Sequence, residues 1–213
     1  MDLEIKNLTA KSQAYKDELA RGLFTKPKSI SSKFFYNEKG DALFQEIMSL
    51  DEYYLTNCEY EIFENQKEEI LDAIYTDDEA FNLIELGAGD GSKTRVLIEY
   101  FLEKNIAFTY YPVDISEHVL KHLESEFKRD YPKLEIHPIN KEYFEAIDYL
   151  SRLSDRKNVI LFLGSNIGNF DIPTCDVFFN SLSKSCSIGD QLLICVELKK
   201  YQNIILKAYA DSE

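Results

Sequence analysis

The sequence lacks any apolar run long enough to cross a membrane, since its longest, near Val159–Leu163, is far too short. It also lacks a basic start followed by an apolar stretch, the pattern of a secretory signal. Cysteine is scarce, and the 4 present lie far apart without a Cys-x-x-Cys pair or the spacing of a zinc site. We therefore expect a soluble, reduced, cytoplasmic protein without a metal centre.

Positive charge is also scarce, because 24 Lys and Arg face 38 Asp and Glu, for a net charge of −14. A chain this acidic repels phosphate backbones and anionic lipid, so nucleic acid and membrane surfaces are poor partner candidates. Hydrophobic residues make up 45% of the chain, which permits a packed core. The 213 residues suffice for one domain with a small helical extension.

The first part of the chain, residues 1–76, has the pattern of a helical segment. Helical spacing of apolar residues covers Thr9–Leu23 and Gly40–Leu50. Thr56 followed by Glu59 three residues later fits a capping box, which predicts a helix with its N-cap at Thr56.

From Phe81 onward, short apolar runs alternate with amphipathic helices, as in buried parallel strands of an α/β sheet. The predicted strands are Phe81–Leu86, Phe108–Val113, Leu134–Ile139, Val159–Leu163 and Gln191–Leu198. The predicted helices are Lys93–Lys104, Glu117–Asp130, Lys141–Arg152, Thr174–Lys184 and Lys199–Tyr209. The pattern predicts an α/β fold: a doubly wound, mostly parallel, Rossmann-like open sheet over residues 77–198.

A glycine-rich loop follows the first predicted strand, with Gly87, Gly89 and Gly91 at every second position. Glycines let the backbone approach a ligand closely, and the next helix directs free N–H groups to the same place. A dinucleotide site requires G-x-G-x-x-G, and a P-loop requires G-x-x-x-x-G-K-[ST], and this loop matches neither pattern. The acidic Glu85 before the first glycine is characteristic of S-adenosylmethionine sites. An ordinary strand-to-helix turn is the alternative.

Asp114 ends the second predicted strand, where an acid can accept hydrogen bonds from both ribose hydroxyls of a nucleotide. NAD and S-adenosylmethionine both carry such a ribose, so this residue does not separate them. Its alternative role is helix capping together with Ser116. A loop rich in glycine and asparagine follows the fourth strand, over Gly164–Asn169, where a substrate or an ordinary turn would fit.

Several stretches of the sequence resemble the histidine-specific Nα-methyltransferases of ergothioneine biosynthesis. The likeness covers essentially the whole chain. It is carried by Lys28–Tyr36, Glu52–Thr56, the glycine loop through Arg95, and Phe162–Asn169. It implies a class I, S-adenosylmethionine-dependent methyltransferase. It also implies that residues 1–76 contribute to the substrate site and that 199–213 begin an acceptor domain.

The resemblance assigns site residues by position. The cofactor contacts it implies are Gly87, Lys93, Asp114, Glu142, Tyr143 and Gly164. The amino-acid substrate contacts it implies are Tyr36, Tyr53, Asn169 and Tyr209. The Glu142–Tyr143 pair departs from the family, which usually has Asp-Phe there. No catalytic side chain is implied, because methyl transfer depends mainly on positioning and on an unprotonated amine.

The family members continue beyond the point that matches Tyr209–Glu213, so the resemblance implies a truncated acceptor domain without the closing strand hairpin. We therefore expect Gln191–Leu198 to form an exposed sheet edge that permits self-association. His118, His122 and His137 have no predicted role.

Three functions remain open from the sequence. The first is Nα-methylation of histidine or a close amino-acid analogue with S-adenosylmethionine. The second is a cofactor-binding fragment without catalysis. The third is an NAD-dependent oxidoreductase, which the glycine spacing disfavours.

Overall fold

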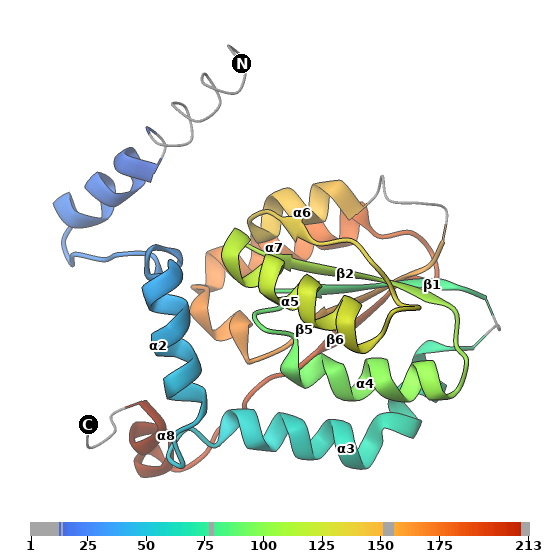
Figure 1. The fold of residues 1–213 in the computed structure, drawn as a ribbon. Coiled ribbons are helices and arrows are strands. Elements are labelled where there is room, and N and C mark those ends of the chain that lie inside the picture. Colours follow the sequence, from blue (N-terminus) through green and yellow to red (C-terminus); the bar gives the residue numbers. More distant parts are fainter. Residues whose placement is uncertain (1–12, 14, 77–78, 151–155, 210–213) are drawn as a thin grey trace. The chain divides into compact units, whose positions relative to one another are not determined.

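The computed structural model describes residue 13 and residues 15–76, 79–150 and 156–209. The chain divides into two compact units, Met1–Asn37 and Glu38–Glu213 (Figure 1). In the first unit, residues 15–24 are helical, and a short 3-10 helix, η1, covers Ser32–Phe35. The helix predicted over Thr9–Leu23 is confirmed where the structure describes it, and its first turn lies outside the described residues.

The second unit is built on a sheet whose described strands all pair in parallel. These strands are β1 (Phe81–Leu86), β2 (Phe108–Asp114), β3 (Glu135–Ile136), β4 (Ile139–Asn140), β5 (Asn158–Phe162) and β6 (Gln191–Ile194). Their order is β3-β2-β1-β5-β6, and β4 also pairs with β2. From β1 the chain moves outward to β2 and β3 and later returns to β5 on the other side. The carboxyl ends of β1 and β5 therefore flank the switch point, where open α/β sheets bind ligands.

Helices cover both faces of the sheet (Figure 1). The covering helices are α3 (Leu55–Ile74), α4 (Ser92–Glu103), α5 (Glu117–Asp130), α6 (Tyr143–Leu150) and α7 (Ile172–Ser185). Two further helices of this unit are α2 (Glu38–Met48) and α8 (Gln202–Tyr209). Side chains of α3, α4 and α5 share one buried core with Leu83 of β1, whereas those of α6 and α7 share another with Ile84. Alternation along each strand thus divides the apolar residues between two cores, as a doubly wound fold requires.

The third predicted strand, Leu134–Ile139, is wrong as a single element. It consists of β3 and β4, which pair with β2 at Tyr110↔Ile136 and Val113↔Ile139. Pro138 lies between them and has no N–H to donate to a ladder, which explains the interruption.

Other predicted boundaries also needed correction. Strand β6 ends at Ile194 rather than Leu198, because its partner β5 ends at Phe162, opposite Ile194. Helix α7 begins at Ile172, two residues before the predicted start, since Asp171 caps it by accepting a hydrogen bond from the Thr174 amide. Helix α6 begins at Tyr143, two residues after the predicted start, and its predicted end at Arg152 lies outside the described residues.

The capping box predicted at Thr56 is absent. Helix α3 begins at Leu55, its N-cap position is Tyr54, and no side-chain hydrogen bond caps it. Glu59 instead lies buried on the apolar face of α3, between Leu55 and Phe63. A Glu in place of an apolar residue at this spacing suggests a function other than capping.

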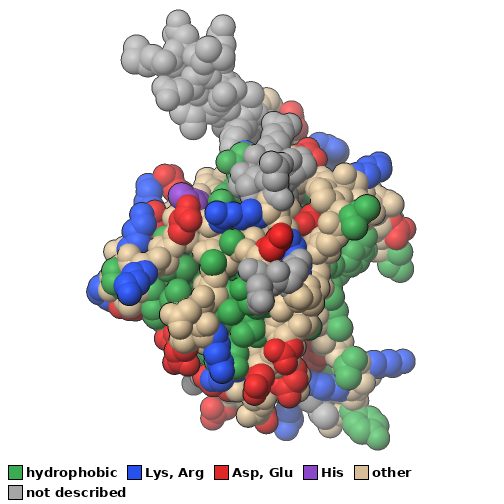
Figure 2. Space-filling model, turned by 90° about the vertical axis from the view of Figure 1, so that its right-hand side faces the viewer, with side chains coloured by type: hydrophobic (Ala, Val, Ile, Leu, Met, Phe, Trp, Pro, Cys, Tyr) green, Lys and Arg blue, Asp and Glu red, His purple; other side chains and the backbone are tan. Residues whose placement is uncertain are grey.

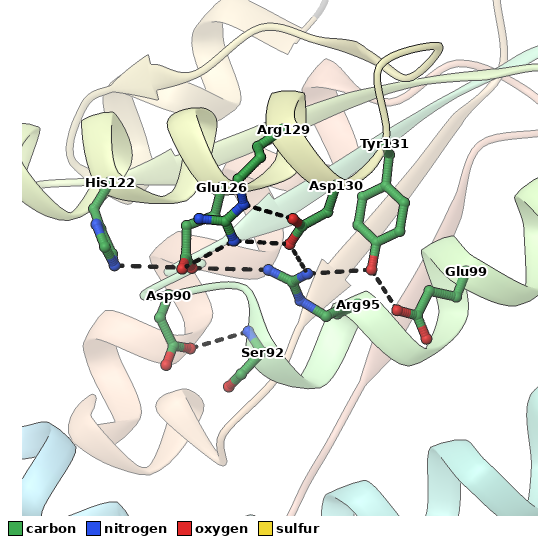
Figure 3. A network of polar contacts seen from close by, with 9 residues as sticks. All are labelled: Asp90, Ser92, Arg95, Glu99, His122, Glu126, Arg129, Asp130 and Tyr131. Atoms are coloured by element: carbon green, nitrogen blue, oxygen red, sulfur yellow. Dashed lines mark hydrogen bonds and ion pairs between the residues drawn. The ribbon is translucent and has the colours of Figure 1, made fainter.

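Polar side chains join α4 to α5 behind the glycine loop (Figure 3). The Arg95 guanidinium contacts Asp130 at 2.7 Å and Glu126 at 3.8 Å, and it donates a hydrogen bond to the Tyr131 hydroxyl. It also lies over the Phe127 ring, 4.7 Å from the centroid. This cluster braces the helix that follows the glycine loop against its neighbour.

Candidate functional site

The glycine loop lies at the carboxyl end of β1 and is held by the end of β2. The amides of Gly87 and Ala88 both donate to the Val113 carbonyl, at 2.8 and 3.0 Å. Gly89 donates its amide to the Asp114 carboxylate at 3.0 Å. Gly91, at φ 68°, is the N-cap position of α4. The loop therefore brings backbone N–H groups and a helix N-terminus together at the carboxyl ends of the strands.

Gly87 lies too close to two neighbouring side chains for a Cβ to fit. Its φ of 75° is left-handed, and a Cβ there would lie 2.6 Å from the Tyr143 hydroxyl and 3.0 Å from the Asn166 side-chain nitrogen. Tyr143 at the start of α6 and Asn166 after β5 thus both face the first glycine. The predicted residues Gly87 and Tyr143 are brought together, and Asn166 joins them.

The Asp114 carboxylate is held in place by two backbone amides. One carboxylate oxygen accepts the Gly89 amide, and the other accepts the Ser116 amide at 2.9 Å. Burial raises the pKa of Asp114, the two amide bonds lower it, and the nearby Asp41 carboxylate raises it. Asp41, on α2, accepts a hydrogen bond from the Ser116 hydroxyl at 2.6 Å. Ser116 also caps α5, so the capping role considered for this segment is supplied by Ser116.

Lys93 and Gly164 meet at a shared carboxylate. A Cβ on Gly164 would lie 3.2 Å from the Lys93 ammonium. Glu59 of α3 accepts a hydrogen bond from that ammonium at 2.5 Å and from the Gly164 amide at 2.7 Å. Glu59 is 6% exposed. Three chain segments, α3, the start of α4 and the loop after β5, are therefore joined at one buried side chain.

Glu85 is buried next to this cluster, near the end of β1. Its carboxylate accepts hydrogen bonds from the hydroxyls of Tyr110, at 2.5 Å, and Thr94, at 2.7 Å. Burial raises the pKa of Glu85 to about 7, although both hydroxyls and the Lys93 charge lower it. The acid predicted from the sequence therefore fixes strands β1 and β2 to helix α4.

Two of the predicted substrate tyrosines lie together. The rings of Tyr53, before α3, and Tyr209, at the end of α8, meet edge to face with centroids 6.0 Å apart. Phe44 of α2 contacts the same Tyr53 ring at 6.4 Å. Nearby in the chain, Tyr54 donates its hydroxyl to Glu197, and the Lys200 ammonium lies 4.0 Å from the Tyr54 ring centroid. The segment after β6 is thus tied to the start of α3.

The remaining predicted residues are placed as follows. Asn169 is exposed at the end of a short 3-10 helix, η2 (Asn166–Asn169), which follows Gly164. Glu142 is exposed and immediately precedes α6, where its carbonyl accepts the Ala146 amide. Tyr36 belongs to the first unit, so it is not placed relative to these residues.

Sequence reasoning missed two residues of this site. Glu59 was assigned to a capping box, although an acid on the stripe formed by Leu55 and Phe63 already indicated a buried charge. Asn166 was noted only as part of a polar loop. Its position beside Gly87 follows from the turn at Gly164 and Ser165, both of which have positive φ.

Solved structures with the same fold include methyltransferases. A carbon methyltransferase domain described as DszA matches with a TM-score of 0.56 and 15% identity, covering 86% of this chain and 45% of that one. Magnesium protoporphyrin IX methyltransferase from Synechocystis matches with a TM-score of 0.54 and 12% identity, covering 83% of this chain and 75% of that one. At these identities the likeness establishes the fold, a class I methyltransferase sheet.

Similar sequences point to one family. The chain is 30% identical over 201 residues to the histidine N-alpha-methyltransferase of Mycolicibacterium smegmatis, covering 94% of this chain and 61% of that protein. It is 30% identical over 187 residues to ergothioneine biosynthesis protein 1 of Schizosaccharomyces pombe, covering 85% of this chain and 24% of that protein. The profile of a family described as histidine-specific, S-adenosylmethionine-dependent methyltransferases matches residues 15–213, and the chain belongs to this family.

Proposed function

We propose that this chain binds S-adenosylmethionine at the carboxyl ends of β1, β2 and β5, and transfers its methyl group to the α-amino group of histidine or a close amino-acid analogue. The observation that carries the proposal is the meeting of Gly87, Lys93, Asp114 and Gly164 at the switch point of the sheet. Family membership supports the same reaction. The chain spans 61% of the M. smegmatis relative, so activity and substrate are proposed for the residues present.

The residues at the switch point fit such a cofactor. Gly87, which carries no Cβ and has a left-handed φ of 75°, lets the backbone approach a ligand closely. The Asp114 carboxylate suits the two ribose hydroxyls, and Lys93 suits the carboxylate of the methionine part. In this proposal Tyr143 and Glu142 border the adenine and Gly164 presents its backbone. We add the neighbouring Asn166 to these proposed cofactor contacts.

The amino-acid substrate is assigned to the side of the site bordered by the aromatic residues. Tyr53 and Tyr209 already contact each other and supply ring faces and hydroxyls for an imidazole and an amine. Asn169 offers an amide for the α-carboxylate or α-amine, and Tyr36 completes the proposed set. The proposed organisation remains a helical segment over 1–76, a cofactor domain over 77–198 and the start of an acceptor domain over 199–213.

The chemistry demands little of the protein beyond placement. S-adenosylmethionine supplies a methyl group already activated on a sulfonium. The chain holds the acceptor amine in line with that carbon. The amine must bind in its neutral form, since an ammonium has no lone pair with which to attack. Polar groups such as the hydroxyls of Tyr53 and Tyr209 orient the amine, so no catalytic nucleophile is required.

A calorimetric titration with S-adenosylhomocysteine tests the cofactor half of the proposal. We expect micromolar binding by the wild-type chain and loss of binding in Asp114→Ala, because that change removes the ribose acceptor and frees the Gly89 amide. Asp176→Ala, at an exposed position on α7, is the matched control and should bind normally. Absence of binding by a wild-type chain that circular dichroism shows folded would contradict the proposal.

Titration of the loaded chain with histidine separates catalysis from cofactor binding alone. Binding of histidine followed by methyl transfer supports the enzyme, whereas cofactor binding without histidine binding supports the fragment. Competition with NAD tests the oxidoreductase, which the family match does not favour.

Self-association through β6 is a further part of the proposal, with a second copy of the chain as partner. Among the described strands, β6 pairs with β5 alone. Leu192 on β6 and Val196 and Leu198 just after it are 37%, 54% and 74% exposed. An apolar edge of this kind pairs readily with another strand.

Nucleic acid is not among the proposed partners, because the net charge of −14 repels phosphate backbones. Acidic, basic and hydrophobic side chains are interspersed on the face in Figure 2. In the described residues no helix is long and apolar enough to cross a membrane, and a cytoplasmic location stays a prediction.

A further inference from the structure

Glu59 is a buried charge on the apolar face of α3. It lies between Leu55, 7% exposed, and Phe63, 1% exposed, and is itself 6% exposed. Carboxylates are almost never buried at such a position unless they are paired and hydrogen-bonded, because desolvation of the charge is costly. The position therefore calls for a role that an apolar residue cannot fill.

The two oxygens of Glu59 bind two different segments of the proposed cofactor site. One accepts from the Lys93 ammonium and the other from the Gly164 amide. The thiol of Cys195, which follows β6, also lies beside this carboxylate, and its pKa is raised to about 12 by burial first and by the Glu59 charge second. One side chain of α3 thus contacts the segments that follow β1, β5 and β6.

Lys93 needs such a partner to stay where it is. It occupies the first turn of α4, whose N-cap is Gly91, and the helix dipole disfavours a cation at that end. Its side chain is 18% exposed, so without Glu59 the ammonium can turn toward water. The Glu59 carboxylate offsets the dipole and directs the ammonium toward Gly164.

Gly164 likewise depends on Glu59. Gly164 and Ser165 both have left-handed backbones, at φ 68° and 52°, and Ser165 adopts that conformation at a steric cost. The hydrogen bond from the Gly164 amide to Glu59 fixes the first residue of this turn. This turn also places Asn166 beside Gly87. A change at Glu59 therefore affects both the Lys93 side and the Gly87 side of the site.

We propose that Glu59 is a positioning residue of the cofactor site, which acts through Lys93 and Gly164 rather than by touching the ligand. The inference rests on the proposed function, since it concerns affinity for the cofactor. The opposite arrangement is that Glu59 competes with the ligand's own carboxylate for the same two donors. The two arrangements predict changes in affinity of opposite sign.

Calorimetry with S-adenosylhomocysteine on four chains tests the proposal: wild type, Glu59→Gln, Lys93→Met and the double variant. Gln removes the charge but can still accept the Gly164 amide, so we expect about tenfold weaker binding, the scale of one charge-assisted hydrogen bond. In the Lys93→Met background, Glu59→Gln should change the affinity by less than about twofold, because the ammonium through which Glu59 mainly acts is already absent. A purely structural role would give additive effects and overturn the proposal.

Controls separate the remaining outcomes. Glu64→Gln breaks a pair with Lys67 on the same helix, where Glu64 is 57% exposed, and should leave binding unchanged. Glu59→Asp keeps the charge but shortens its reach, so it provides a second test if Glu59→Gln does not fold, and it should also bind more weakly. Tighter binding in either Glu59 variant shows competition and overturns the proposal, as does unchanged binding. No binding by the folded wild type refutes the proposed function itself.

Discussion

Replacing Glu85 with Gln should change how the stability of the chain depends on pH. The carboxyl is 2% exposed, and burial raises its pKa from 4.5 to about 7 in the folded protein. A raised pKa means that the folded state binds the proton more tightly than the unfolded chain does. The stability from this group is therefore complete below about pH 4.5 and is lost as the pH rises through about 7.

The size of the effect follows from the shift. A pKa of about 7 in place of 4.5 corresponds to about 3 kcal/mol once the group is ionised in both states. Between about pH 5 and about pH 8, the wild-type chain should lose roughly 2–3 kcal/mol of unfolding free energy through Glu85 alone. In Glu85→Gln this loss is absent. The amide also leaves Tyr110 or Thr94 with a poorer acceptor, a cost that does not vary with pH.

Urea denaturation of both chains at the two pH values measures the effect. The stability of Glu85→Gln relative to wild type should be higher at about pH 8 than at about pH 5 by roughly 2–3 kcal/mol. The comparison of differences cancels the other titrating groups that the two chains share. Tyr110→Phe serves as a companion variant, because loss of a hydrogen bond to the carboxylate should raise the Glu85 pKa further. A relative stability that stays constant across this range would refute the argument.

The remaining predictions concern the glycine loop and the sheet edge. Gly87→Ala should weaken binding of S-adenosylhomocysteine by tenfold or more, on the order of 1.4 kcal/mol, because its Cβ meets the Tyr143 hydroxyl at 2.6 Å in a left-handed backbone. Calorimetry measures this, and Gly168→Ala, where a Cβ meets no atom within 4 Å, should bind normally. In light scattering, the wild-type chain should be self-associated and the Leu192→Lys variant monomeric. A wild type that is itself monodisperse and monomeric would refute the edge proposal.

The sequence alone determined the architecture of the second unit and indicated where its candidate site lies. Continuous apolar runs such as Phe81–Leu86 predict buried parallel strands, and the loop from Gly87 to Gly91 predicts a ligand-binding turn, because both depend on local composition. Helix α5 matches its predicted limits, Glu117–Asp130, since Ser116 at its start provides the local signal of a cap.

Other features were decided by contacts between segments distant in the sequence. Strand β6 ends where β5 ends, and nothing in Val196–Leu198 itself indicates that limit. Local pattern assigned Glu59 to a cap, whereas the fold placed it against Lys93 and Gly164, 34 and 105 residues away. A buried carboxylate can only be matched to donors once the strands have brought them together. The sequence therefore determined which residue types follow the carboxyl ends of the strands, and the tertiary structure decided which of them bind one another.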